Sequence, residues 1–427
     1  MTAISKNMDT DSRSLRYTPA LILTVFMLLV GGFIVQASAN MAKIEPDRKG
    51  TQESSEIIKE PKSPIDYVKD QAVYCALGIL AAMCAYFVPH SWFKSKTSFY
   101  CLAAGILILL GMVYIFPDTS NQEKNVRRWV VLPIINKSFQ PSEFAKLSIV
   151  MLVAIWSCLN PKSIQKTFNL KGGLVIPGLI ISFILLLIFV EPDYATTLIC
   201  ASIAIAALYV GGAPMVRISF FMALVVGILG FTVLTHTERG TRIKAWHSLF
   251  EIPSDISEEE KNKILNENRQ QLSSIKAIAM GHISGTGLGM GASKLGRLSE
   301  HDSDFIYAGL AEEFGFAGSL ALLIGFVFIL YAGASIAVRT QDHFGRVMAM
   351  GIVTMISLQV VLHISTTSAL VPNTGLTLPF FSSGGSNLVV MMVAMGLLMS
   401  VERESSSAHS VTNSSQSAAA ALQNPFD

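Results

Sequence analysis

Residues 300–338 read EHDSDFIYAGLAEEFGFAGSLALLIGFVFILYAGASIAV. A charged lead-in ends at Asp304, and the apolar run that follows is interrupted near its start only by Glu312 and Glu313. About 20 apolar residues are enough to cross the hydrocarbon core of a bilayer, so the run predicts a membrane-spanning helix. Two acids about two turns into such a helix are costly in lipid, and they indicate a face turned toward a water-filled cavity or toward basic partners such as Lys146 or Arg242.

The rest of the 427-residue chain has the same character. Hydrophobic residues make up 51% of it and charged residues only 15%, whereas a soluble domain carries about 25% charged residues. The net charge of +2 gives no general attraction for nucleic acid. All five cysteines fall in apolar runs, so no disulfide framework is expected and a metal site stays unknown.

Each apolar run must be helical, because lipid cannot satisfy open backbone groups. We therefore expect an all-α integral membrane protein, a polytopic bundle of ten transmembrane helices. The predicted helices cover residues 17–39, 71–88, 98–116, 143–159, 173–190, 194–212, 218–235, 306–338, 347–366 and 387–401.

Lysines and arginines in the short loops predict the orientation. The loops 89–97 and 160–172 hold lysines and no acid, so we expect them to face the cytoplasm. With ten spans, both termini are then cytoplasmic, and the predicted location is the inner membrane of the cell. The chain then divides into a cytoplasmic segment 1–16, a membrane domain 17–401 and a flexible cytoplasmic tail 402–427. Three longer loops face outward, over residues 40–70, 117–142 and 236–304.

The largest outward loop contains a predicted surface helix near 257–279. Residues 257–260, Ser-Glu-Glu-Glu, resemble a capping box, and apolar residues then recur at helical spacing. We expect this amphipathic helix to lie on the membrane surface and to take part in controlling activity.

Outward residues near the membrane supply a candidate anion site. Pro141 predicts the start of a helix, with Glu143 and Lys146 one turn apart on one face. One interpretation is an ion pair that fixes the helix end. The other is a cationic mouth for a phosphate-bearing lipid, with Arg128 as the better fork for phosphate oxygens.

Two turn-forming segments have simpler interpretations. In Glu191-Pro192-Asp193 we favour an N-cap role for Asp193. The glycines of residues 281–289 favour a structural turn over a phosphate cradle.

Two further features leave chemistry open. Asp304 is either an acid favoured by the helix dipole or a general base whose proton affinity is raised by apolar walls. Residues 372–386, PNTGLTLPFFSSGGS, break the backbone at membrane depth, where it must line a cavity or be buried in protein. Their hydroxyls could bind sugar or pyrophosphate, or could pack helices.

Taken in order, these segments resemble the shape, elongation, division and sporulation (SEDS) family of peptidoglycan polymerases, typified by FtsW, RodA and SpoVE. The resemblance covers about residues 127–400, and the short spacing from Gly287 to Leu298 favours the division branch. The residues that carry it are Arg128-Trp129, Gln140 to Glu143 with Lys146, Asp193, Arg239, Arg242, Gln271-Leu272, Gly285 to Gly289, Leu298, Glu300, Asp304 to Ile306, Glu312-Glu313, Gly315, Thr374 to Phe380, Ser382 and Gly384 to Ser386.

The resemblance implies a SEDS fold and a glycosyltransferase that polymerises lipid II into glycan strands on the outer face of the membrane. Asp304 would be the catalytic carboxylate, and undecaprenyl pyrophosphate would be the leaving group. A divalent ion, Mg²⁺ or Mn²⁺, could bind the pyrophosphate. The implied partners are a class B penicillin-binding protein and other division membrane proteins. The implied substrate-binding residues are Arg128, Glu143, Lys146, Arg242, Gln271, Ser382, Gly384 and Ser386.

The sequence departs from the family pattern at several positions, among them Ser299, Asp302 and Ser383. These departures leave open which residues contact the sugar. Two other functions remain as alternatives. A transporter could use the same groove to flip lipid II across the bilayer, and a non-enzymatic scaffold could organise a division complex. The alternatives differ from the enzyme in whether Asp304 performs chemistry.

Overall fold

The computed structural model describes the greater part of the chain and leaves out several loops and both ends. The described residues are 16–41, 64–116, 128–132, 137–164, 173–191, 193–219, 246–248, 264–266, 268–291 and 303–423, together with positions 223, 227 and 250.

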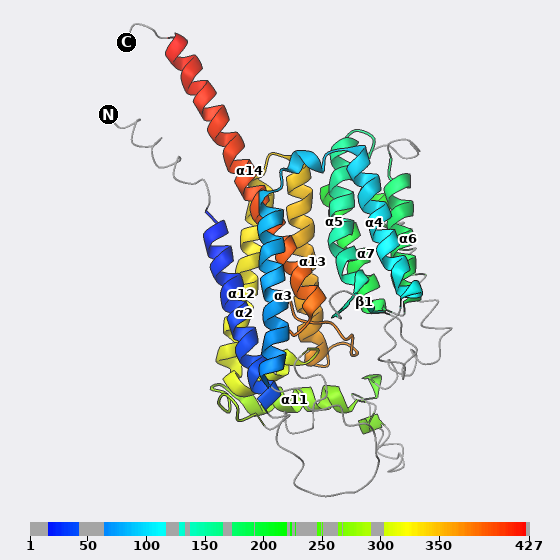
Figure 1. Cartoon of the computed structure of the whole chain (residues 1–427), viewed down its shortest axis with the longest axis vertical. Coiled ribbons are helices and arrows are strands. Elements are labelled where there is room, and N and C mark those ends of the chain that lie inside the picture. Colours follow the sequence, from blue (N-terminus) through cyan, green and yellow to red (C-terminus); the bar gives the residue numbers. More distant parts are fainter. Residues whose placement is uncertain are drawn as a thin grey trace, which may run out of the picture.

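Long helices run side by side through the molecule and form a bundle (Figure 1). They are α2 (Thr18–Met41), α3 (Pro64–Phe87), α4 (Lys96–Ile115), α5 (Pro141–Leu159), α6 (Val175–Val190), α7 (Tyr194–Val210), α12 (Ile306–Arg339), α13 (His343–Thr367) and α14 (Gly385–Gln423). Six of them are long and apolar enough to cross a membrane, and shorter apolar helices cover Gln71–Phe87, Val175–Val190 and Tyr194–Val210. Nine of the ten predicted spans thus correspond to described helices. The tenth, predicted over 218–235, falls almost wholly outside the described residues.

The core of the bundle lies along α5 and α13. Almost every residue of α5 from Pro141 to Ser157 is buried. Helix α13 contacts α5, α7, α12 and α14, so it joins the group α2, α3, α12 and α14 to the group α4, α5, α6 and α7. Outward-facing side chains of α2 and α4 are instead large and apolar, as a lipid environment requires.

Three elements differ from the sequence expectation. A short antiparallel hairpin, β1 (Val130–Leu132) with β2 (Lys137–Phe139), occupies part of the predicted 117–142 loop. Helix α3 begins at Pro64 rather than near 71. Helix α14 continues to Gln423, where a flexible tail was expected from 402; its final residues AAAALQ have high helix propensity.

A surface helix, α11 (Arg269–Gly281), lies across one end of the bundle (Figure 1). It corresponds to the C-terminal half of the helix predicted near 257–279, and the proposed capping box at 257–260 lies outside the described residues. Its protein-facing residues are Gln271, Ser274 and Ala277 at helical spacing, whereas Ile275 and Met280 are exposed. The helix therefore packs through a polar and small face and leaves apolar side chains outward.

Helix α12 is bent at Gly315, whose backbone angles are φ 63° and ψ −158°. The glycine-rich loop 281–291 docks into this bend. Thr286 and Gly287 donate backbone hydrogen bonds to the carbonyls of Glu312 and Glu313, and Phe316 donates to that of His282. A methyl group at Gly285 would overlap the Glu313 carbonyl, so glycine permits the close approach.

Candidate active site at the end of the bundle

Asp304 lies just before the first residue of α12 and is half-buried. The neighbouring Phe305 is fully buried and fixes the start of the helix. On the other side, a methyl group at Gly375 would lie 3.4 Å from Asp304 Oδ2, so the backbone of the irregular segment runs close beside the carboxylate. Ser382 Oγ donates to the carbonyl of Ser303 at 2.8 Å and ties the two segments together. The carboxylate is thus held between a helix start and an ordered loop.

The loop between α13 and α14, residues 368–384, is non-helical. Side chains from three helices bind its carbonyl groups. Gln359 Nε2 of α13 donates to Thr377 O at 2.9 Å, and Gln271 Nε2 of α11 donates to Val371 O at 2.8 Å. Gln36 Nε2 of α2 donates to Phe381 O at 2.6 Å. Protein side chains therefore satisfy carbonyl groups along the broken backbone, and its second half, from Leu376 to Ser382, is largely buried, which is how irregular structure at membrane depth is tolerated.

His363 of α13 makes a further contact to this loop. Its Nδ1 lies 2.7 Å from the Leu376 carbonyl oxygen, which can only accept, so Nδ1 must carry the proton. Gln36, Gln359 and His363 were not singled out from the sequence. The signal available was a polar side chain inside an apolar run, which is rare unless it has a partner.

The β1–β2 hairpin and the α6–α7 turn meet beside the same loop. Ser386 Oγ accepts from the Gln140 backbone N–H at 3.1 Å, and Gln140 Nε2 donates to Asp193 Oδ2 at 3.0 Å. Asp193 Oδ1 accepts from Thr196 N–H at 3.2 Å, which confirms its predicted N-cap role. These contacts connect the start of α14 to the start of α7 through Gln140.

Arg128 lies half-buried just before β1, and its Nε donates to the Glu191 carbonyl oxygen at 3.2 Å. The Glu191 side chain is 1% exposed, and neither of its carboxyl oxygens has a hydrogen-bond partner among the described residues. Burial, reinforced by the negative charge of Asp193, raises the pKa of Glu191 to about 8, although the Arg128 guanidinium opposes the shift. The α6–α7 turn therefore places a carboxyl group of raised pKa, that of Glu191, near the guanidinium of Arg128.

Lys146 lies one turn inside α5 and is fully buried. Its Nζ lies 2.6 Å from Glu143 Oε2 and 2.9 Å from Gln359 Oε1. The predicted Glu143–Lys146 pair is confirmed, and it has the geometry of the ion pair that fixes the helix end. Pairing of Lys146 with Glu312 or Glu313, one of the alternatives raised from the sequence, does not occur: Lys146 binds Glu143 and Gln359. Glu313 Oε1 instead accepts from Ser38 Oγ at 2.9 Å and from Gly289 N–H at 3.2 Å.

The remaining predicted site residues fall into three groups. Gln271, Ser382 and Ser386 are buried: Gln271 and Ser382 hold the loop by the contacts given above, and Ser386 binds Gln140. Gly384 is half-buried, and a methyl group there would lie 3.1 Å from Thr377 Cγ2. Arg242 lies outside the described residues, as do Ser299 and Asp302.

No group of three His, Cys, Asp or Glu side chains suited to a metal ion occurs in the part of the chain that the structure describes. Those residues do not form a ready-made site for the divalent ion that the sequence analysis raised. The glycine loop 281–291 likewise packs on α12 through its backbone N–H groups, which supports the structural turn favoured from the sequence.

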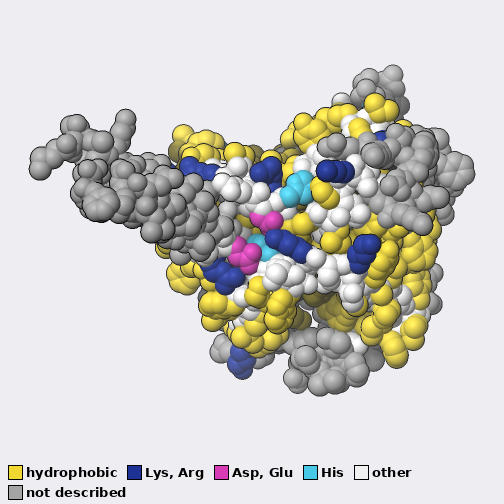
Figure 2. All heavy atoms as spheres, turned by 90° about the horizontal axis from the view of Figure 1, so that it is seen from above, with side chains coloured by type: hydrophobic (Ala, Val, Ile, Leu, Met, Phe, Trp, Pro, Cys, Tyr) yellow, Lys and Arg dark blue, Asp and Glu magenta, His cyan; other side chains and the backbone are white. Residues whose placement is uncertain are grey.

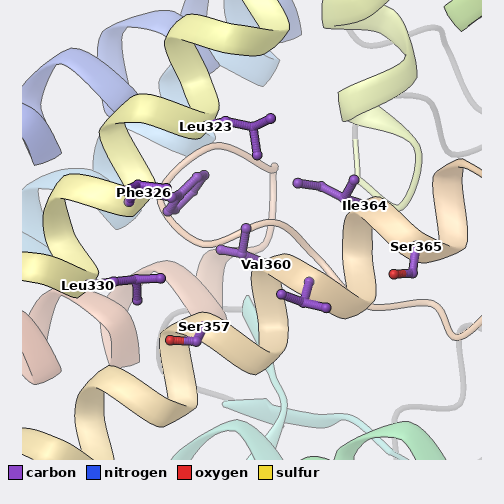
Figure 3. Close-up of a pocket in the computed structure, with 9 residues that line it drawn as sticks. Leu323, Phe326, Leu330, Ser357, Val360, Ile364 and Ser365 are labelled. Atoms are coloured by element: carbon purple, nitrogen blue, oxygen red, sulfur yellow. The ribbon is translucent and has the colours of Figure 1, made fainter.

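An apolar pocket of about 270 Å³ opens between α12 and α13 (Figure 3). Leu323, Phe326 and Leu330 of α12 face Val360 and Ile364 of α13 across it. Its polar lining consists of two serine hydroxyls, so it offers nothing for charge stabilisation and is not the chemical centre.

Comparison with known proteins identifies relatives of this chain. A probable peptidoglycan glycosyltransferase FtsW of Nitrosomonas europaea is 32% identical over 90% of this chain and 92% of its own. The stage V sporulation protein E of Bacillus subtilis is 31% identical over 79% of this chain and 87% of its own.

Solved structures share the fold. A chain from a peptidoglycan synthase complex that coordinates polymerization and crosslinking superposes with a TM-score of 0.67 at 22% identity, covering 90% of this chain and 97% of that one. The rod shape determining protein RodA of Thermus thermophilus superposes with a TM-score of 0.60 at 23% identity, over 90% and 96% of the two chains. The FtsW/RodA/SpoVE model, described as a cell cycle protein, matches residues 19–407, and the chain belongs to that family.

Proposed function

We propose that this protein is a glycosyltransferase that polymerises lipid II into glycan strands at the outer face of the cytoplasmic membrane during cell division. The observation that carries the proposal is the placement of Asp304, a half-buried carboxylate held by an ordered loop at one end of a membrane bundle. The names of the related proteins, probable peptidoglycan glycosyltransferases, support the reaction class.

In the proposed reaction, Asp304 accepts the proton of a hydroxyl group on the acceptor sugar. The hydroxyl oxygen attacks the anomeric carbon of the donor sugar, a new C–O bond forms, and the bond from that carbon to the diphosphate breaks. The diphosphate leaves on its undecaprenyl chain with the electron pair of the broken bond. Arg128 stabilises the charge that develops on the leaving group.

The residues around Asp304 keep the carboxylate in position. Ser382 anchors the preceding backbone, and Gln359 and His363 hold the loop that runs beside it. The reaction rate falls steeply when the catalytic base is misplaced. The residues that hold the Asp304 carboxylate in position are therefore part of the proposed function.

The membrane arrangement belongs to the same proposal. We assign both termini to the cytoplasm and the Asp304 end to the outer face, because basic side chains gather at the opposite end of the bundle. A penicillin-binding protein that crosslinks the strands is the proposed partner. A solved relative of the same fold belongs to a complex of polymerization and crosslinking, which supports this partner class.

The direct test is polymerisation of labelled lipid II by the purified chain in detergent or vesicles. Wild-type protein should produce long glycan strands, and Asp304→Asn should lower the rate by about 10²-fold or more while the protein stays folded. Asp342→Asn is a matched control, because this acid caps α13 at the opposite end and an Asn side chain can also cap.

The outcomes separate the three functions. Polymer made at the wild-type rate by Asp304→Asn would contradict the assignment of the base. Translocation of lipid II across vesicles without polymer would favour a transporter. Full complementation of cell division by Asp304→Asn, in cells that lack the wild-type chain, would favour a scaffold.

A further inference from the structure

Glu191 is a buried acid that the proposed reaction does not use. Its side chain is 1% exposed, and neither oxygen has a hydrogen-bond partner in the part of the chain that the structure describes. An ionised carboxylate in this position would lack both water and hydrogen-bond donors, which is expensive unless a nearby cation compensates it. The nearby cation among the described residues is Arg128, whose Nε donates to the backbone carbonyl oxygen of Glu191.

Within the described ranges, the charged and titratable groups around Glu191 come from three parts of the chain. Arg128, ahead of β1, favours the ionised carboxylate, and Asp193, at the start of α7, opposes it. From α4, Tyr114 places its phenol at 3.5 Å from the Leu187 carbonyl, close enough to feel the charge of Glu191. The half-buried Arg128 is therefore the cation, among the described residues, that acts on the Glu191 carboxyl, and an anion bound by Arg128 would compete with that carboxyl for its charge.

We propose that Glu191 is a positioning residue for Arg128: when its carboxyl is protonated, the guanidinium charge acts on a diphosphate, and when it is ionised, it draws that charge to itself. The inference rests on the proposed function, since the diphosphate is the leaving group assigned there. Glu191 does not touch the reacting atoms. It sets how strongly Arg128 attracts the lipid diphosphate.

The sign of the pH dependence follows from the raised pKa. Burial holds the pKa of Glu191 at about 8, so the carboxyl is mostly neutral at pH 7 and ionises above pH 8. A bound diphosphate would favour the neutral form further, so binding above pH 8 takes up one proton from water. A phosphate group has its second pKa near 6, so the ligand itself adds little to this alkaline change.

The test measures binding of labelled undecaprenyl diphosphate to the purified full-length chain between pH 7 and pH 9.5. Wild-type affinity should fall above pH 8, by up to about tenfold per pH unit for one proton. Glu191→Gln is permanently neutral and has nearly the same shape, so its affinity should be the same at pH 9 as at pH 7. In polymerisation assays the alkaline change should appear in kcat as well as in KM, because Arg128 also stabilises the charge that develops on the leaving group.

A second variant keeps the proposal testable if Glu191→Gln does not fold. Asp193→Asn retains a capping oxygen but removes the negative charge that helps to raise the pKa of Glu191. Its loss of affinity should begin at a lower pH than in the wild type. Asp342→Asn, at the opposite end of the bundle, serves as the control and should keep the wild-type profile.

An alkaline decline that persists unchanged in Glu191→Gln, or in Asp193→Asn where the first variant does not fold, would overturn the inference. The proposed function is tested separately by polymerisation at pH 7. Failure of the wild-type chain to polymerise lipid II would remove the reaction, whereas a wild-type pH profile in Glu191→Gln would remove only the role of this residue.

Discussion

Lys146 is the residue whose replacement should cost the most stability. It is fully buried with Glu143, and removing one member of a buried ion pair leaves an uncompensated charge that costs about 3–5 kcal/mol. Lys146→Met should therefore lower the apparent Tm of the purified protein strongly, and Lys146→Met combined with Glu143→Leu should recover part of the loss. Lys94→Gln is the control, because its pair with Asp342 is about one-third exposed and contributes about 0–1 kcal/mol.

If the single and double variants lost the same amount, an uncompensated charge on Glu143 would not be the cause of the loss. The comparison also separates packing from charge, since both Met and Leu are apolar. A thermal-shift assay in one detergent at a fixed pH gives all four values on the same scale.

Local sequence predicted contacts that lie within one turn of a helix. The spacing of Glu143 and Lys146 predicted their pair, and the position of Asp193 predicted its cap, because both depend on helix geometry alone. Contacts between distant segments were not accessible in this way. Nothing in the spacing places Ser38 beside Glu313 or Gln36 beside Phe381, since these depend on how the helices pack.

At the scale of elements, the docking of loop 281–291 onto α12 depends on glycine for two different reasons. Gly285 and Gly289 both have positive φ, but only at Gly285 would a methyl group meet another segment. Gly289→Ala should cost about 1–2 kcal/mol for the left-handed backbone. Gly285→Ala should cost about 1–3 kcal/mol more, because it also forces the loop off the Glu313 carbonyl.

Limited proteolysis of the loop and apparent Tm would measure this difference. Gly111→Ala in α4, where a methyl group would meet nothing within 4 Å, provides a baseline for substitution in a helix. Equal effects of Gly285→Ala and Gly289→Ala would mean that backbone conformation alone, without close approach, explains the glycines.

A second element-scale prediction concerns the end of the bundle opposite Asp304. His90, in the turn between α3 and α4, is buried, with Nδ1 at 3.0 Å from Glu404 Oε2 and Nε2 at 2.8 Å from Ser400 Oγ of α14. Burial lowers the pKa of His90, although Glu404 opposes the shift. The unfolded chain therefore binds a proton more readily than the folded one, and stability should fall as the pH drops through about 6.5.

The expected slope from this residue is at most about 1.4 kcal/mol per pH unit, with no contribution well above pH 7. Thermal unfolding between pH 5 and pH 8 measures it. His90→Gln should show a shallower acid decline than the wild type. An acid decline of the same steepness in both proteins would assign the effect to other groups.

Most helices could be predicted from the sequence, and the elements that were missed have a common cause. Apolar runs mark spans because lipid imposes one rule on every helix, and nine predicted runs correspond to described helices. The β1–β2 hairpin and the continuation of α14 lie where no such rule acts, since both extend into polar surroundings. The broken backbone of residues 372–386 was expected to line a cavity or to be buried in protein, but the side chains that hold it were not identified from the sequence.

At the scale of the whole molecule, one end of the bundle brings together helix ends and basic side chains. Tyr17 N–H donates to Glu402 Oε1 at 2.9 Å, so the start of α2 and the end of the membrane part of α14 lie at one end. The α3–α4 and α12–α13 turns join them through the Lys94–Asp342 pair. Basic side chains are spread across this end, as Figure 2 shows. Among them are Lys94, Lys96, Arg339, Arg346 and Arg403.

The basic side chains at this end predict the membrane topology. Positive loops are retained in the cytoplasm, so this end should be cytoplasmic and Asp304, at the opposite end of α12, should face outward. Alkaline phosphatase is active only when it is exported. Fusions after residue 120 should therefore be active, whereas fusions after residues 341 and 407 should be inactive, and fluorescent-protein fusions at both termini should fluoresce.

Active phosphatase after residue 341 would place Asp304 in the cytoplasm, where the glycan strand cannot be built outside the cell. That result would contradict the topology and the proposed reaction together, because both require this carboxylate on the outer side.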